Sequence, residues 1–284
     1  MSVLLSGADP RLLPEPVLAR FVAAATARGG RVAVVVGAGS GPGPFEGIAA
    51  RLGSAGPVEV EALPLAPGEP LTLPDDPARL GGLVVTDVDA ATLLAALGER
   101  LAPLARTIRG GLAYLGLGAG ARLAARHAIV SGSLSDGRRI ADEASGPGEL
   151  VLADGLALVG TTIETDTDAH QRLERAVTAV ITGPAAYALA LDEGVTLLVD
   201  PVSGSHEALG AGIVQWLHCD GGDVRIRRTR AVPLAPAPSP MTPPPTGDAP
   251  AATAGDPAPS PGPTDSPTGV DPSAPASGKA SSCP

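Results

Sequence analysis

Short apolar runs bounded by glycine or proline alternate with longer amphipathic stretches along most of this chain. The runs at 2–5, 31–36 and 83–86 are rich in valine and leucine and are too short for helices. Helical patterns lie between them, at 16–28 and 45–52. Strands that are apolar on both faces and alternate with helices are typical of a parallel α/β sheet. The opening part of the chain therefore predicts this fold class.

The pattern changes in the later part of the chain. A helical stretch at 90–109 leads to a buried run at 112–115, and a further helix is expected at 168–181. Other apolar runs predict strands at 58–62, 186–191, 195–199, 213–217 and 224–228. Because the last strands follow one another without helices, we expect a late antiparallel extension of a mostly parallel, doubly wound sheet.

Composition divides the chain into two parts. Beyond residue 231 the sequence is almost entirely Pro, Ala, Ser, Thr, Gly and Asp, a composition that cannot bury enough apolar surface to fold. We therefore expect an α/β domain at 1–230 and a disordered Pro/Ala/Ser-rich tail at 231–284. Because P-x-x-P matches such as Pro240–Pro243 are nearly unavoidable in such a tail, a spacer is favoured over a partner-docking motif.

The charge of the chain bears on its partners. A formal net charge of -10 argues against nucleic acids or anionic membranes as partners held by charge alone. The densest basic cluster alternates along the last expected strand, which is typical of a solvated sheet edge. It consists of Arg225, Arg227, Arg228 and Arg230.

Neither a cofactor nor a metal is expected. The two cysteines, Cys219 and Cys283, form neither a disulfide framework nor a metal spacing. The histidines lack carboxylates at ligand spacing, apart from weak local pairs such as His206 and Glu207. The N-terminal residues lack the charged and apolar regions of a secretory signal, and no run is long enough to span a membrane. The expected compartment is the cytoplasm.

Two glycine-rich turns follow expected strands and invite a comparison with dinucleotide-binding loops. The turn at 36–41 is followed by Pro42 and Pro44, which crowd the start of a phosphate-binding helix. The turn at 116–121 fits G-x-G-x-x-A, but no strand ending in Asp or Glu follows about 20 residues later. Structural turns are therefore favoured over a nucleotide site.

The turn at 116–121 also has the pattern of a nucleophile elbow, a sharp strand-to-helix turn that exposes a catalytic residue. It reads Gly-Leu-Gly-Ala-Gly-Ala and follows Arg109-Gly110-Gly111. This turn resembles the G-T-S-A-G-A elbow of the cyanophycinase and dipeptidase E family of serine peptidases. Other segments resemble the family's motifs in the same order: 83–90, 190–193, 197–199 and 208–212. The resemblance covers residues 2–230 and implies a flavodoxin- or glutamine-amidotransferase-like fold.

The resemblance implies a serine nucleophile, a histidine base and an orienting acid, and this chain departs from the family at the first two. Gly118 stands at the nucleophile position and has no side chain with which to form an acyl-enzyme. When Arg172 and Arg175 are matched to the family's R-x-x-R pair, Asp166 falls at the histidine position. Glu193 falls where the family carries its acid.

The backbone donors of the oxyanion hole are altered as well. Ala119 follows the elbow, whereas Asp87 and Val88 replace the paired glycines of the family. A carboxylate beside a developing oxyanion is unfavourable, and a β-branched residue resists the backbone angles that glycine permits. His170 replaces the missing base only if the helix expected at 168–181 already runs through Asp166.

Together these losses predict a catalytically inactive protein of this family that keeps the fold and a reshaped cleft. The expected ligand is a small peptide or an amino-acid-derived molecule, and the expected partner is a second copy of the chain. The alternative is a peptide or amide hydrolase with a relocated nucleophile, although the serines at 131, 133 and 135 fall in a segment typical of strand and turn. A nucleotide-binding oxidoreductase is the third hypothesis.

Overall fold

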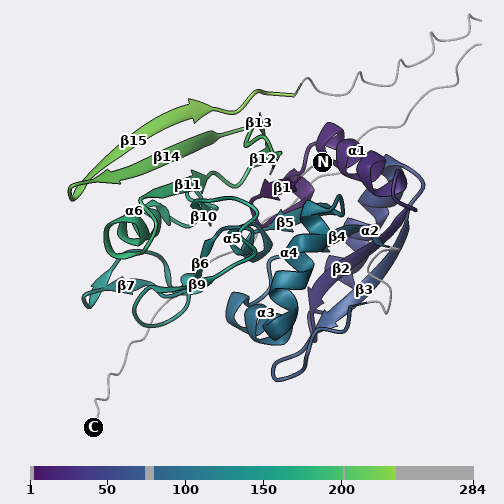
Figure 1. The fold of residues 1–284 in the computed structure, drawn as a ribbon, viewed down its shortest axis with the longest axis horizontal. Coiled ribbons are helices and arrows are strands. Elements are labelled where there is room, and N and C mark those ends of the chain that lie inside the picture. Colours follow the sequence, from purple (N-terminus) through teal and green to yellow (C-terminus); the bar gives the residue numbers. More distant parts are fainter. Residues whose placement is uncertain (1–2, 74–79, 201, 235–284) are drawn as a thin grey trace, which may run out of the picture. The chain divides into compact units, whose positions relative to one another are not determined.

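A computed structural model describes residues 3–73, 80–200 and 202–234 (Figure 1). The larger sheet consists of β1 (Val3–Ser6), β2 (Arg31–Gly37), β3 (Glu59–Leu65), β4 (Leu80–Val85), β5 (Ala113–Leu117), β12 (Val195–Val199) and β13 (His206–Gly210). Within the described residues its order is β13-β12-β1-β5-β4-β2-β3. Neighbouring strands in the series β1-β5-β4-β2-β3 pair in parallel. At the β1 edge, β12 pairs antiparallel with β1, and β13 pairs antiparallel with β12. The predicted α/β class and its antiparallel extension are confirmed.

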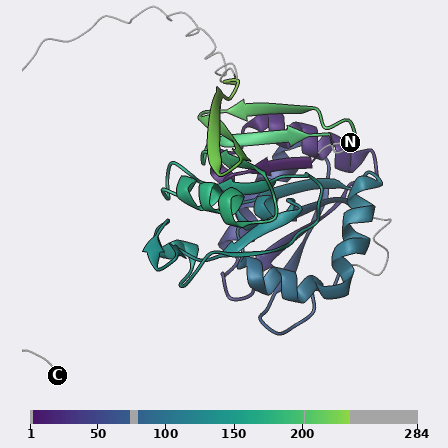
Figure 2. The same cartoon turned by 60° about the vertical axis from the view of Figure 1, so that its left-hand side comes forward.

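Helices cover both faces of this sheet. One face carries α1 (Glu15–Thr26) and α2 (Gly43–Ala55), and the other carries α3 (Ala90–Leu97), α4 (Leu101–Arg109) and α5 (Ala119–Leu123). The two views show α1 and α4 on opposite sides of the strands (Figures 1 and 2). Side chains alternate along each strand, so Leu4 packs with the first group while Val3 and Leu5 pack with the second. This arrangement is the doubly wound core that the apolar runs predicted.

The single helix expected at 90–109 is divided in the structure. Gly98 has a φ of +45°, which a helix does not tolerate, and its amide donates back to Leu94 to end α3. One 3-10 turn at 98–100 then leads into α4. The apolar periodicity runs through the break, which is why it did not reveal the glycine's role.

Four strands form a second sheet, whereas the sequence predicted one extended sheet. They are β10 (Thr162–Thr165), β11 (Tyr187–Leu191), β14 (Ile213–Asp220) and β15 (Asp223–Arg230), in that order within the described residues. The helix α6 (Leu173–Thr182) covers one face, and the other face joins the core of the larger sheet through Ile163, Leu189 and Val214. The strands expected at 186–191, 213–217 and 224–228 therefore belong to this second sheet.

Smaller elements connect the two sheets. A short antiparallel pair joins β6 (His127–Ser131) to β9 (Val151–Asp154), and a hairpin joins β7 (Leu134–Ser135) to β8 (Arg138–Arg139). After β15 the chain turns back to β13, where the Val232 amide donates 2.8 Å to the Ala208 carbonyl. Residues 235–284, most of the predicted tail, lie outside the described residues. None of the described helices is both long and apolar enough to span a membrane.

Candidate functional site

The elbow sequence forms a sharp turn between β5 and α5. Gly118 has φ +52° and ψ −111°, a conformation in which side chains are strained and glycine is not. Its amide donates 3.0 Å to the Ser6 carbonyl at the end of β1, and its carbonyl accepts from the Arg122 amide at 3.0 Å. Position 118 therefore lies at the carboxyl ends of parallel strands, where open α/β sheets place their ligands.

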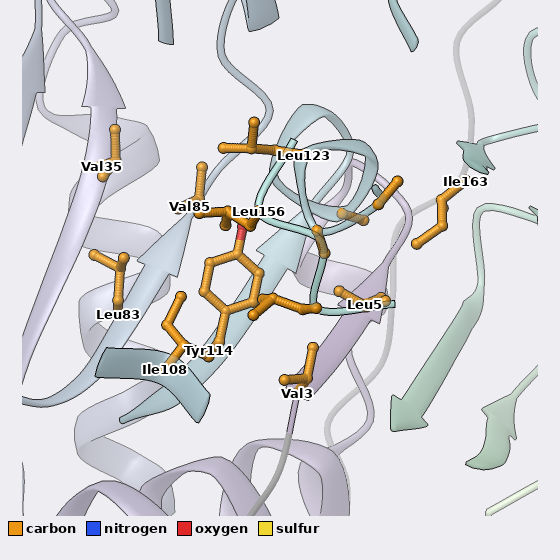
Figure 3. Close-up of a cluster of buried hydrophobic side chains, with 14 of the residues drawn as sticks. Val3, Leu5, Val35, Leu83, Val85, Ile108, Tyr114, Leu123, Leu156 and Ile163 are labelled. Atoms are coloured by element: carbon orange, nitrogen blue, oxygen red, sulfur yellow. The ribbon is translucent and has the colours of Figure 1, made fainter. Parts of the chain in front are cut away.

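Close packing beneath the turn explains the neighbouring glycines. A Cβ on Gly116 would lie 2.6 Å from the Gly120 carbonyl carbon, so the strand and the first turn of α5 touch backbone to backbone. Tyr114 is buried among apolar side chains of the core (Figure 3). Its hydroxyl donates a 2.7 Å hydrogen bond to the Gly120 carbonyl. The turn is thus held from the core side as well as from β1.

Asp87 occupies the space in front of the elbow. Its Oδ1 accepts a 2.7 Å hydrogen bond from the Ala119 amide, the donor that follows the nucleophile position. A Cβ built on Gly118 would lie 2.5 Å from Asp87 Cγ and 2.8 Å from its Cβ, with Oδ1 closer still. The Val88 amide donates instead to the Thr86 carbonyl at 2.9 Å. A carboxylate of the chain itself therefore holds the donor at 119.

Asp166 lies at the end of β10, against the loop that follows β1. It is fully buried, its φ is +57°, and its Oδ1 accepts a 2.8 Å hydrogen bond from the Ala8 amide. A Cβ on Gly7 would lie 2.6 Å from the same oxygen, so only glycine fits at position 7. Burial raises the pKa of Asp166, and the negative charge of Asp87 acts in the same direction.

Glu193 follows β11 and reaches the site with its backbone. Its carbonyl oxygen lies against Gly7, next to Asp166, and its amide donates 2.8 Å to Asp168 Oδ1. The carboxylate of the preceding residue, Asp192, is buried, unlike that of Glu193. It accepts a 3.1 Å hydrogen bond from the Thr167 hydroxyl. The chain therefore brings positions 166 and 193 together, and Asp192, adjacent to the position chosen from sequence, holds the loop after β10.

A group of buried charges lies beneath Asp87. Glu164 on β10 is fully buried, 3.4 Å from Arg175 Nε and 3.7 Å from Arg122 Nη1. Arg122 Nη2 is in turn 3.8 Å from Asp87 Oδ1. Burial lowers the pKa of Arg175, and the charge of Glu164 opposes that effect. Sequence reasoning missed Glu164, because a lone Glu in a short strand gives no signal of burial.

His170 does not take over the role of a base at Asp166. The helix expected at 168–181 begins at Leu173, because Asp166 and Gln171 have φ values of +57° and +50° that interrupt helical geometry. His170 Nδ1 instead lies 2.8 Å from Asp142 Oδ2. The expectation of a helix at 168–172 is therefore wrong.

Ser145 lies on the other side of Asp142. Its hydroxyl donates 2.8 Å to Asp142 Oδ1 and accepts a 3.0 Å hydrogen bond from Arg172 Nε. Partial burial opposes ionisation of Asp142, but the hydrogen bonds from Ser145 and His170 outweigh it and lower the pKa of Asp142. These residues link the segment around Ser145 to the start of α6.

A cavity of about 280 Å³ opens beside Asp87. Carboxylates from the connection between β4 and α3 form part of its wall, and guanidinium groups from α5 and the α6 region form another part. Its lining includes Asp87, Asp89, Arg122, Ser145, Arg172 and Arg175. Among the residues that the structure describes, no group of three or more His, Cys, Asp or Glu side chains is arranged to hold a metal. The site is thus a polar pocket with walls of both charges.

Comparison with known proteins relates this fold to peptidases. No family model and no curated protein matches the sequence. The structure is similar to that of a peptidase from an acI-B1 Actinobacterium, with a TM-score of 0.57 and 14% identity, covering 81% of this chain and 94% of that one. It is also similar to a protein described as a peptidase E from Listeria monocytogenes EGD-e, with a TM-score of 0.50 and 16% identity, covering 80% and 98% of the two chains. The chain therefore has a peptidase E-type α/β fold.

Proposed function

We propose that this chain is a non-catalytic binding protein built on a peptidase-type fold. One observation carries the proposal: the Asp87 carboxylate fills the space in front of Gly118 and accepts from the Ala119 amide. A serine peptidase needs a hydroxyl in that space and an unoccupied backbone donor beside it. Here an anion of the chain itself takes both places.

The expected loss of activity is large. Removal of a triad serine reduces turnover by about six orders of magnitude in the best-studied protease. An oxyanion-hole donor contributes a further factor of roughly 10²–10³, and the Ala119 amide is already engaged. The resemblance places Asp166 where the family has its histidine, so by this match the described residues offer no imidazole at that position to accept a proton. Binding, rather than bond cleavage, is the function that this geometry supports.

A relocated nucleophile is the rival hypothesis, and Ser145 is the hydroxyl that best fits it, because it lines the cavity. The serine–histidine mechanism of acyl transfer requires a histidine directly against the hydroxyl. In a catalytic triad the histidine lies between the serine and the carboxylate. Here the carboxylate lies between them, since the Ser145 hydroxyl donates to Asp142 and His170 contacts the far oxygen of Asp142. The lowered pKa of Asp142 makes it a weak base. This arrangement favours positioning over catalysis.

The two signs of charge around the cavity favour a zwitterionic, amino-acid-derived ligand. The carboxylates of Asp87 and Asp89 match an ammonium group, and the guanidinium group of Arg172 matches a carboxylate. A volume of about 280 Å³ suits an amino acid or a dipeptide rather than a long peptide. We propose that the cleft binds a ligand of this class.

Labelling with a fluorophosphonate probe tests the absence of catalysis. The full chain is expected to remain unlabelled under conditions in which an active serine protease reacts completely. Labelling of the folded protein would overturn the proposal. If that label disappears in Ser145→Ala, the relocated nucleophile is identified.

Calorimetric titration tests the ligand class separately. A panel of amino acids and dipeptides is compared with the matching amines, which lack the carboxylate, and with N-acetyl derivatives, which lack the ammonium group. We expect binding of the zwitterions alone, weakened about tenfold by Arg172→Lys, because a lysine cannot replace the two-point contact of arginine. The matched control, Arg20→Lys, changes an exposed arginine paired with Glu207 and should leave affinity unchanged. Equal binding of the amines would refute the ligand class while leaving the non-catalytic assignment in place.

A further inference from the structure

A groove lined by aromatic and basic side chains lies on the second sheet, away from the elbow. The face of this sheet opposite α6 is only partly covered by the core of the larger sheet. The rest of that face carries Tyr187, Trp216, His218, Arg225 and Arg227, which the strand register places side by side. We call these five residues the aromatic groove.

Two adjoining hollows lie over the aromatic groove. The first, of about 340 Å³, is lined by all five residues. The second, of about 280 Å³, shares Trp216 with the first and extends to His206 on β13. Small-molecule sites usually have volumes of about 300–1,000 Å³, so the first hollow alone is large enough to hold a small ligand.

The rings of the groove are arranged for stacking. Those of Tyr187 and His218 lie with centroids 4.5 Å apart and planes 7° apart. The rings of Trp216 and His206 also lie 4.5 Å apart, centroid to centroid, with planes 46° apart. Tyr187 is 54% exposed, so burial in the core does not account for an aromatic residue at this position. A planar ligand can extend the ring pair, because flat π-faces stack on one another.

Positive charge accompanies these rings. Arg225 and Arg227 line the first hollow, and the Arg227 guanidinium lies 5.6 Å from the centre of the Trp216 ring. Among the residues that the structure describes, no Asp or Glu lines either hollow. The cavity beside Asp87, by contrast, has walls of both charges. On a chain with a formal net charge of -10, the aromatic groove is therefore a local site for an anionic group.

We infer that the aromatic groove binds a nucleoside monophosphate. Its base stacks on the ring pair of Tyr187 and His218, and its phosphate accepts hydrogen bonds from the guanidinium groups of Arg225 and Arg227. These arginines lie opposite His218 and Trp216 in the strand register, so ring and charge are neighbours here, as base and phosphate are in a nucleotide. Stacking tolerates any base, because every base has a π-face. The aromatic groove therefore recognises the class rather than one nucleobase.

Two arginines favour a phosphate over a carboxylate. The planar guanidinium group forms paired hydrogen bonds with either anion. A terminal phosphate has three acceptor oxygens and nearly two negative charges, whereas a carboxylate has two oxygens and one charge. A phosphate can therefore engage Arg225 and Arg227 together, and an aromatic carboxylic acid gains less from the second arginine.

The second hollow favours a single phosphate and a single nucleotide. Its described lining is mainly apolar, with Leu158, Val159 and Leu197, and includes no arginine. Further phosphates would therefore find no additional guanidinium among these residues. A longer strand would also place its other phosphates over a chain of net charge -10, which repels them. A mononucleotide is the occupant that both charge and volume favour.

The fluorescence of Trp216 reports binding in the full chain, because it is the protein's one tryptophan and lines both hollows. Adenosine monophosphate is compared with adenosine, which lacks the phosphate, and with ribose phosphate, which lacks the base. We expect saturable quenching by adenosine monophosphate, and binding of each fragment weaker by about tenfold or more. Equal affinity for either fragment would overturn the proposal. The absence of a response to adenosine monophosphate would do the same, whether or not a single-stranded oligonucleotide binds.

Substitutions at Tyr187 test the stacking contact. Tyr187→Ala should weaken the binding of adenosine monophosphate about tenfold, whereas Tyr187→Phe keeps the ring and should bind like the native chain. Because Tyr187 is exposed, both variants are expected to fold. If the alanine variant binds as tightly as the native chain, the ring is not used and the proposal is wrong.

Arginine pairs provide the matched comparison for the phosphate. Arg225→Gln with Arg227→Gln should weaken binding about tenfold or more, whereas Arg138→Gln with Arg139→Gln, an exposed pair on β8, should have no effect. Arg172→Lys alters the polar cavity near the elbow and should also leave the affinity for adenosine monophosphate unchanged. Unchanged affinity in the Arg225/Arg227 variant, or a loss of affinity in Arg172→Lys, would overturn the proposal. Neither result would bear on the absence of catalysis at the elbow.

Discussion

The carboxylate of Asp87 stands in the space into which any side chain at Gly118 would project. The two residues follow neighbouring parallel strands, β4 and β5, whose register brings Val85 opposite Gly116. Their proximity is fixed by the sheet and not by a flexible loop. The side chain at position 87 therefore limits which side chain fits at position 118, and the effect of a substitution at 118 on stability depends on the residue at 87.

Gly118→Ser is expected to destabilise the protein by about 1–3 kcal/mol, the usual cost of overpacking, because Asp87 must leave its hydrogen bond with Ala119. Adding Asp87→Gly to this variant opens the space and should recover the part of the loss that comes from overpacking, while the backbone strain of a side chain at φ +52° remains. Urea unfolding of the single and double variants measures both values. A single variant as stable as the native chain would show that Asp87 is not confined.

Tyr114→Phe is expected to lower the free energy of unfolding by about 0.5–1.5 kcal/mol, because the buried Gly120 carbonyl loses its hydrogen bond from the tyrosine. The cavity left by one hydroxyl is small, so little else changes. Tyr187→Phe serves as the control, since that residue is exposed and its substitution should stay within about 0.5 kcal/mol. Thermal and chemical unfolding measure both variants. If Tyr114→Phe and Tyr187→Phe lower the free energy of unfolding equally, the Tyr114 hydroxyl does not have the proposed role beneath the elbow.

Arg175→Met is expected to cost about 3–5 kcal/mol, because it leaves the fully buried Glu164 without its nearest cation. The double variant with Glu164→Gln removes the orphaned charge and should be more stable than Arg175→Met alone. Denaturant unfolding of both variants gives the comparison. If the double variant is the weaker of the two, Arg122 already balances the charge of Glu164.

Asp166→Asn is expected to raise the melting temperature at pH 8 and to have little effect below about pH 4. The pKa of Asp166 is raised in the folded state, so the stability that its protonated form gives at low pH is lost as pH rises through that pKa. Asparagine keeps the acceptor for the Ala8 amide and tolerates the positive φ.

Asp142→Asn provides a control of opposite sign. The pKa of Asp142 is lowered, so its contribution is present above the ordinary value for aspartate and is lost as pH falls. This substitution should therefore destabilise the protein at pH 8. If both asparagine variants shift the melting temperature in the same direction at pH 8, the assignment of the two carboxylates is wrong.

Much of the sheet was predictable because its strands are apolar on both faces. Runs such as 31–36 and 83–86 predict β2 and β4 directly. Thr162–Thr165 was missed because Glu164 interrupts its apolar pattern, and only the partners Arg122 and Arg175 make that residue tolerable in the interior. A strand stabilised by a tertiary charge contact carries no local signal.

The sharp turn at Gly118 was predictable, but its contacts were not. The glycine pattern at 116–121 located the turn, and Asp87 was noted as a replacement for a glycine. That its carboxylate would reach the Ala119 amide depends on the register between β4 and β5, which no local pattern reports. Likewise, the left-handed conformation of Gln171 delays α6, and nothing in a helical periodicity distinguishes residues 168–172 from the helix that follows.

The arginines of β15 have a consequence for assembly. This strand ends the second sheet within the described residues and leaves its outer backbone groups without a neighbouring strand. Arg225 and Arg227 lie on one face and Arg228 and Arg230 on the other, so positive charge flanks the edge on both sides. Two copies that met edge to edge would bring these charges together and repel, which protects an otherwise regular, eight-residue strand from extending into fibrils.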